Sequence, residues 1–107
     1  MDTFTVRDLR ERTGELIRDA ESGHLSVVTK HGRPVFVAVP FDDVVLETGI
    51  LPALAVKLYT EEVMSLGKAA KFASFSVAEF TELLAKWGIP SVNYSPGELQ
   101  EELDTIG

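Results

Sequence analysis

Two β-branched runs joined by a two-residue turn constrain the fold more than any other feature of this chain. The runs cover Leu25–Lys30 and Pro34–Val39, and His31-Gly32 between them is typical of a tight turn, which predicts a β-hairpin. The second run is apolar at consecutive positions, so both faces of its strand need cover. We expect helices of the same chain on one face and a second copy on the other, with the C-terminal part of the same chain as the alternative cover. The residues predicted to form this dimer interface are Val35, Phe36, Val37 and Val39.

Helix-capping residues precede the hairpin. The segments predicted there are an extended segment and two short helices, over residues 2–5, 6–12 and 14–22. Thr5 is placed to cap the first helix, with Asp8 three residues later in a capping-box-like arrangement. Thr13 is placed to cap the second helix, and Gly23 to end it. We therefore predict that residues 1–49 form one unit with the element order β-α-α-β-β.

Charge is distributed unevenly along the sequence. Ten Lys and Arg stand against seventeen Asp and Glu, a net charge of −7 that argues against DNA binding over the whole surface. Every arginine lies within the first 33 residues, however, and the planar guanidinium suits phosphates and guanine edges. After Asp43, four lysines stand against nine acidic residues, which favours a basic protein partner for that part. The alternative for the arginines is a solvated helix face with the pairs Arg7–Glu11 and Glu15–Arg18.

The remainder of the chain is helical in pattern, and we predict that residues 50–107 form an all-helical unit, which makes the chain α+β. The helices predicted after the hairpin cover residues 43–47, 53–59, 65–73, 76–87 and 96–103. Asp42 is placed to cap the first of these, and Gly49 to end it. The pair over residues 65–87 has helix-turn-helix spacing, although Ser74 replaces the usual turn glycine.

Polar residues on the last helix of this pair indicate its use. Ser76 and Glu79 predict a capping box at its start. Its exposed side chains include the carboxylates of Glu79 and Glu82, which DNA phosphates would repel. We therefore expect this unit to contact protein, with a minor role in DNA binding as the alternative.

The residue inventory argues against catalysis and against membrane insertion. Cysteine is absent, and His24 and His31 lack a third ligand at metal spacing. The sequence contains neither a nucleophile elbow nor a glycine-rich phosphate loop. No apolar run approaches about 18 residues, and the first residues do not resemble a signal peptide. We expect a cytoplasmic, non-enzymatic protein with no cofactor, no metal and no membrane partner.

The run from Phe4 to Asp43 resembles the Phd/YefM-type antitoxins of type II toxin-antitoxin systems. The resemblance is carried by Thr-Val-Arg-Asp-Leu-Arg from residue 5, Gly-Glu-Leu-Ile from residue 14, and the hairpin from Val27 to Val35. It implies a dimer whose paired sheets lie beneath a DNA-facing surface. It places the DNA-contacting arginine of the first helix at Arg10 and a basic residue of the hairpin turn at Lys30. The residues predicted to contact DNA are Thr5, Arg7, Arg10, Arg12, Lys30, His31 and Arg33.

Residues 53–104 resemble a small helical antitoxin-like family associated with PIN-domain toxins. The shared features, in order, are Ala-Leu-Ala-Val-Lys-Leu-Tyr, Ser-Leu-Gly-Lys-Ala-Ala, Ser-x-x-Glu-Phe and Gly-Ile-Pro. The resemblance implies that this part contacts a toxin, and large apolar side chains dominate such interfaces. The residues predicted to contact the toxin are Leu58, Tyr59, Phe72, Trp87, Tyr94 and Leu99. For Trp87 the alternative is a place in the helical core.

Together these features predict an antitoxin that neutralises a toxin by direct binding and represses its own operon as a dimer or higher homo-oligomer on operator DNA. The toxin is expected to be an endoribonuclease, a PIN-domain protein as the first candidate and a RelE-like protein as the second. One alternative is a free-standing DNA-binding transcriptional regulator without a toxin. Another is an interaction module whose arginines are structural.

Overall fold

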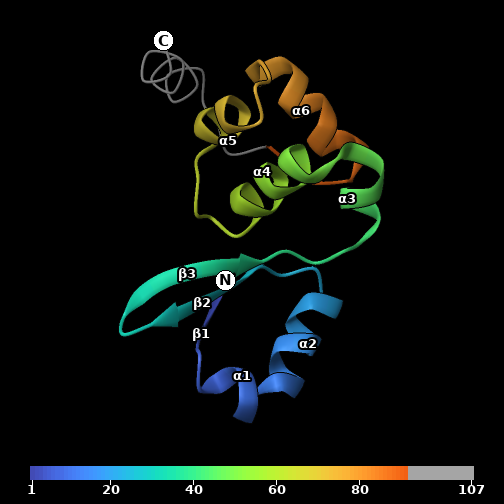
Figure 1. Ribbon diagram of the computed structural model, residues 1–107. Coiled ribbons are helices and arrows are strands. Elements are labelled where there is room, and N and C mark those ends of the chain that lie inside the picture. The colour runs from blue at the N-terminus through green and yellow to red at the C-terminus, as the bar shows by residue number, and fades with distance from the viewer. Residues whose placement is uncertain (92–107) are drawn as a thin grey trace. The chain divides into compact units, whose positions relative to one another are not determined.

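A three-stranded sheet organises the first of two compact units, Met1–Leu46, in the computed structural model, which describes residues 1–91 (Figure 1). The strands are β1 (Asp2–Thr5), β2 (Ser26–Lys30) and β3 (Arg33–Ala38), in the order β1-β2-β3. β1 runs parallel to β2, and β2 runs antiparallel to β3. The α+β class and the element order β-α-α-β-β are thus confirmed.

The hairpin turn follows from its two residues. His31 and Gly32 have φ values of 51° and 75°, and a positive φ at both central residues is characteristic of the type I′ turn that joins twisted strands. Each strand of the hairpin begins and ends within one residue of its predicted limits. A register shift between Val28 and Thr29 adds a bulge that the sequence pattern did not predict.

Two short helices, α1 (Asp8–Glu11) and α2 (Thr13–Glu21), follow β1. Thr5 and Asp8 form the predicted reciprocal pair: the Asp8 N–H donates to Thr5 Oγ1 over 3.0 Å, and the Thr5 N–H donates to Asp8 Oδ2 over 2.9 Å. The prediction that Thr13 caps α2 is wrong. Thr13 is the first helical residue, and its hydroxyl donates to the carbonyl of Leu9 because almost no chain separates the two helices.

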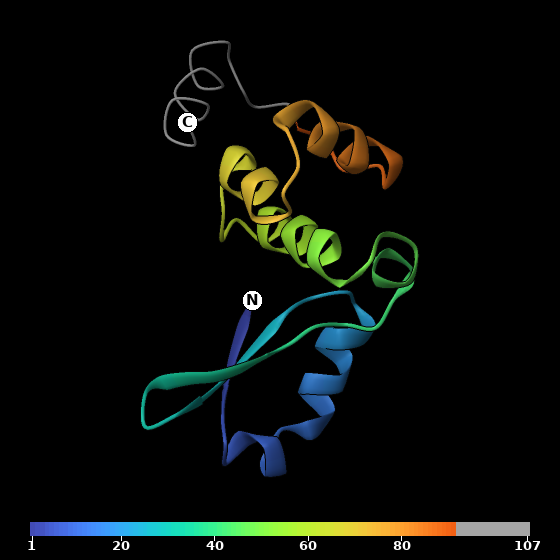
Figure 2. The same cartoon turned by 45° about the horizontal axis from the view of Figure 1, so that its top comes forward.

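The core of the first unit is small. Phe4, Leu25 and Val28 are fully buried, whereas none of the residues 13–21 of α2 is. α1 lies against β1 and α2 against β2, which confirms a helical cover on one side of the sheet (Figure 2). The edge strand β3 is left exposed: Val35, Phe36 and Val37 retain 58%, 48% and 46% of their accessible surface.

The second unit starts at Glu47 and is helical as far as the structure describes it. Its helices are α4 (Ile50–Thr60), α5 (Leu66–Phe72) and α6 (Val77–Lys86), and α3 (Asp43–Thr48) crosses the boundary between the units. The predicted cap of α3 is present, since the Val45 N–H donates to Asp42 Oδ1 over 3.2 Å. α4 begins at Ile50, earlier than predicted, because Pro52 falls in the first turn, where its missing N–H costs no helical bond. The helix predicted over residues 96–103 lies outside the described residues.

Small residues bring the helices of the second unit close together. Its core consists of Ala55, Val56, Leu66, Ala69, Ala70, Ala73, Phe80 and Leu84. The helix-turn-helix-like arrangement of α5 and α6 is confirmed. Ser65 caps α5, and Ser76 forms the predicted capping box with Glu79, with bonds of 3.0 and 2.9 Å. These backbone and side-chain hydrogen bonds of Ser76 lower the pKa of Glu79.

Three helix ends in the second unit share one cap. After α4, α5 and α6, the residues Glu62, Ser74 and Gly88 have φ values of 61°, 60° and 69°. At each end, the N–H of this residue and the next N–H bond back to carbonyls of the last turn, which is the Schellman pattern. Glycine adopts this left-handed conformation without strain, whereas a side chain makes it unfavourable.

Replacing Ser74 by glycine is expected to raise the free energy of unfolding by about 0.5–1 kcal/mol, since relief of the left-handed strain exceeds the added entropy of the unfolded chain. Urea denaturation followed by circular dichroism measures the change. Ser74→Ala is the control, because it keeps the β-carbon and should change stability by less than about 0.5 kcal/mol. Equal effects of the two substitutions would contradict the assigned strain.

Candidate functional site

Exposed basic residues gather at one end of the sheet. Because β1 is parallel to β2, with Thr5 paired to Thr29, the turn that leads into α1 and the hairpin turn lie at the same end. The Val6 N–H donates to the Thr29 carbonyl over 3.1 Å and holds the two segments together. Arg7 and Arg10 come from the first segment, and Lys30, His31 and Arg33 come from the hairpin; all five are exposed. We call these five residues the basic end.

The members of the basic end differ in how they are held. Arg7 Nε lies 3.2 Å from Glu11 Oε1, the predicted i,i+4 pair, and the Arg7 side chain remains 82% exposed. Arg10 makes no ion pair with any residue in the range 1–91. An exposed ion pair such as Arg7–Glu11 contributes little stability. A phosphate would therefore displace Glu11 from Arg7 at little cost in free energy.

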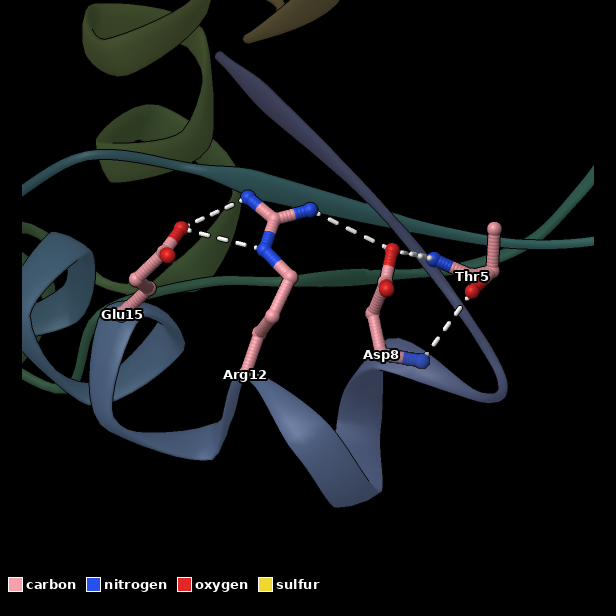
Figure 3. A network of polar contacts seen from close by, with 4 residues as sticks. All are labelled: Thr5, Asp8, Arg12 and Glu15. Carbon is pink, nitrogen blue, oxygen red and sulfur yellow. Dashed lines mark hydrogen bonds and ion pairs between the residues drawn. The ribbon is translucent and has the colours of Figure 1, made fainter.

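Arg12, which is also predicted to contact DNA, joins three elements of the first unit (Figure 3). Its Nη1 lies 3.2 Å from Asp8 Oδ2, and its Nη2 lies 2.6 Å from Glu15 Oε2. Its guanidinium carbon stands 4.5 Å above the centre of the Phe4 ring, a cation–π distance. The hydrogen bond and charge of Glu15 raise the pKa of Arg12. Glu15 thus pairs with Arg12 rather than with Arg18, the partner predicted from spacing.

The pKa of Asp8 is lowered, chiefly by the Thr5 N–H and further by Arg12. A carboxyl group with a depressed folded-state pKa stabilises the fold above its usual value of 3.8 and loses that contribution as the pH falls below it. The link between β1 and α1 therefore weakens in acid. Thr5 and Arg12 both have these internal partners, and their contacts with DNA stay predictions.

Asp19 shows the opposite shift at a small cavity of about 200 Å³ lined by Met1, Asp2, Asp19 and His24. A hydrogen bond with the Asp2 side chain, followed by burial, raises the pKa of Asp19. The resulting stabilisation is present below the usual value of 3.8 and is lost as the pH rises through the raised pKa. Among residues 1–91, no three His, Asp or Glu side chains are grouped so as to hold a metal ion.

The residues predicted to contact a toxin are spread over the second unit. Phe72 is exposed, and Leu58 is half-buried. Tyr59 is half-buried, packs edge-on to Phe80 with centroids 6.3 Å apart, and lies 3.5 Å from the Pro90 carbonyl through its hydroxyl. Trp87 is half-buried beneath the Lys86 ammonium, which lies 5.8 Å from the ring centre. Tyr94 and Leu99 lie outside the described residues.

Two features escaped the sequence analysis. Large apolar side chains are exposed on and beside α3 and the first turn of α4, namely Phe41, Leu46, Ile50 and Leu51. The second unit also contains a cavity of about 460 Å³ beside Tyr59 and Glu62. The apolar residues on both sides of Gly49 in the sequence could have indicated the exposed apolar side chains. The cavity depends on tertiary contacts, which the sequence pattern does not show.

Comparison with known proteins identifies both parts of the chain. Residues 35–107 match the model of an uncharacterised protein family, UPF0175. The chain belongs to the UPF0175 family. Residues 1–48 match the antitoxin Phd_YefM of type II toxin-antitoxin systems, so the predicted two-part resemblance is confirmed. This second match supports a type II antitoxin.

Two curated UPF0175 proteins illustrate how far the likeness extends. The protein of Archaeoglobus fulgidus is 43% identical over 54 residues, which are 50% of this chain and 61% of the relative. The protein of Aeropyrum pernix is 46% identical over 59 residues, which are 55% of this chain and 65% of the relative. The chain therefore spans less than two thirds of either relative. No solved structure matches it. Within residues 1–91, every helix is too short or too polar to cross a membrane.

Replacing Arg12 by glutamine is expected to lower the thermal midpoint by several degrees, because the change removes both ion pairs and the charge above Phe4. Arg7→Gln is the matched control, since it removes the same charge from a side chain with one exposed pair and should shift the midpoint little. Differential scanning fluorimetry at pH 7 compares the two variants. Equal shifts would show that the Arg12 network does not support the first unit.

Proposed function

We propose that this UPF0175 protein is an antitoxin that neutralises a toxin through its second unit and represses its own operon as a DNA-bound homodimer in the cytoplasm. The proposal is supported by one observation: two features lie close together in the segment that matches Phd_YefM. The apolar edge strand β3, which pairs with β2 along one edge and has no strand on its other edge in the described chain, lies next to a set of exposed cations. The first calls for a second copy, and the second for a polyanion.

A dimer through β3 would satisfy the edge strand. Its N–H and C=O groups and its side chains Val35, Phe36 and Val37 are the groups that an added strand or sheet face covers. A unit of this size with three fully buried large side chains also has little core of its own, so a partner adds needed burial. Val39, the fourth predicted interface residue, is half-buried and directly follows the last residue of β3.

The basic end would then occur twice, related by the two-fold axis of the dimer. A palindromic operator presents its two half-sites with the same symmetry. Arg7 is the member of the basic end that has a side-chain ion pair within residues 1–91. We assign the principal contact to Arg10, the position at which the resemblance to Phd/YefM-type antitoxins places the DNA-contacting arginine, with Arg7, Lys30, His31 and Arg33 as further contacts. Their charge contributes a salt-dependent part of the affinity.

The second unit would bind the toxin. It carries the exposed Phe72 and the half-buried Tyr59 and Trp87, side chains of the kind that anchor interfaces. On its α6 helix the exposed Glu79 and Glu82 disfavour DNA. The resemblance of this part favours a PIN-domain endoribonuclease as the toxin, with a RelE-like protein as the second candidate.

Affinity purification from the native locus at moderate salt, followed by mass spectrometry and growth assays, tests this function. We expect a stoichiometric partner that is toxic when expressed alone and harmless together with this chain. Recovery of the homodimer with promoter DNA alone would favour a free-standing transcriptional regulator and would contradict toxin neutralisation.

Replacing Val37 by aspartate is expected to convert the dimer into a monomer of 11.7 kDa. A carboxylate left unpaired in an interface costs about 3–5 kcal/mol, at least a hundredfold in Kd. Val63→Asp is the control, because Val63 in the second unit is equally exposed, at 47% against 46%. Light scattering after size exclusion measures both masses, and a Val37→Asp dimer would rule out β3 as the interface.

Replacing Arg10 by glutamate is expected to weaken binding to a duplex from the chain's own promoter by about tenfold or more at 0.1 M salt, because an attraction becomes a repulsion twice per dimer. Arg18→Glu makes the same charge change on α2, away from the basic end, and should alter Kd by less than about threefold. Fluorescence anisotropy measures both. Equal losses would mean that net charge, and not the assigned surface, determines binding.

A further inference from the structure

A cavity of about 460 Å³ belongs to the second unit. Three stretches of chain form it: the end of α4 at Tyr59, the connection to α5 at Glu62 and Met64, and Ile89-Pro90 after α6. The Tyr59 hydroxyl beside the Pro90 carbonyl and the packing of Ile89 on the helical core hold these stretches together. Cavities of about 300–1,000 Å³ are the size in which proteins hold small groups.

Glu62 gives this cavity its charge. It is the one charged side chain among the described residues that line the cavity, while Tyr59, Met64 and Ile89 supply apolar wall. Glu62 is exposed and has φ 61°, a conformation that glycine would adopt with less strain. Packing therefore does not explain the Glu62 side chain, which is available to a ligand.

We propose that this cavity receives an arginine side chain of the toxin, with the guanidinium paired to Glu62 and the aliphatic stem lying against Tyr59, Met64 and Ile89. The inference rests on the proposed function, because the toxin supplies the arginine. Arginine fits both parts of the site: its stem packs on apolar surface, and its planar cation pairs with carboxylates and stacks on aromatic rings. A neutral or acidic side chain would leave Glu62 without a counter-charge.

Titration of the full ¹⁵N-labelled chain with N-acetyl-arginine amide tests the chemistry of the cavity without any toxin. We expect amide shifts at Glu62, Met64 and Ile89 that saturate. N-acetyl-citrulline amide has the same shape without the charge and should bind at least about tenfold more weakly. Equal binding of the two probes, or shifts elsewhere only, would overturn the inference. Shifts at the same residues on dilution of the protein alone would assign the cavity to a second copy and would also overturn it.

Variants of Glu62 separate a binding role from a structural one. Glu62→Gln should abolish the preference for arginine over citrulline, and Glu62→Gly should do the same while raising the thermal midpoint. Glu82→Gln, which removes an exposed charge from α6, should leave the preference unchanged. A Glu62→Gln chain that still prefers arginine would overturn the inference.

The toxin recovered by affinity purification provides the second readout. Calorimetry should show that Glu62→Gln weakens toxin binding by about tenfold, equivalent to about 1.4 kcal/mol, and that Glu82→Gln changes it less than twofold. Unchanged affinity in Glu62→Gln would overturn the role of the cavity and leave the proposed function standing. If the unaltered chain binds no toxin, the proposed function is overturned. The inference that a toxin supplies the arginine is then overturned as well.

Discussion

The edge strand β3 is the constraint from which the first unit follows. β2 is satisfied on both sides, by β1 and by β3, and the two helices lie against β1 and β2. β3 is left with one hydrogen-bonding edge and three exposed apolar side chains, a combination that promotes uncontrolled association unless a specific partner covers it. The proposed homodimer would remove this hazard and supply burial that three fully buried side chains cannot. The same topology brings the cations to one end, so the proposed dimerisation and the proposed DNA binding share one cause.

Local geometry separates the arginine that is held by several internal partners from those that remain exposed. Glu15 is three residues from both Arg12 and Arg18, so spacing alone leaves its partner undetermined. The buried Phe4 ring on β1 resolves the choice, because Arg12 can stack on that ring and reach Glu15 at once. The guanidinium that looked available for phosphate is thereby used to join β1, α1 and α2. Arg10, with no such neighbour, keeps its charge exposed.

Features set by neighbouring residues were predictable, and features set by distant contacts were not. The hairpin turn, the Thr5–Asp8 pair and the Ser76–Glu79 capping box depend on residues within four positions of each other, and all three are confirmed. The Thr13 cap failed because α1 and α2 are almost continuous, which depends on the Arg12 network. The cavity beside Glu62 escaped the sequence analysis because Pro90 approaches Tyr59 only after α6 folds back, 31 positions along the chain.

Strain and core composition together explain why the second unit suits a binding partner. Four of its eight buried core residues are alanines, which bury less apolar area than leucine and so contribute less stability. Two of its Schellman caps use Glu62 and Ser74 where glycine would be less strained. A unit with this limited margin gains most from a ligand that binds only the folded form, since such binding adds stability by mass action. If an arginine of the toxin pairs with Glu62, binding offsets the strain at the residue that causes it.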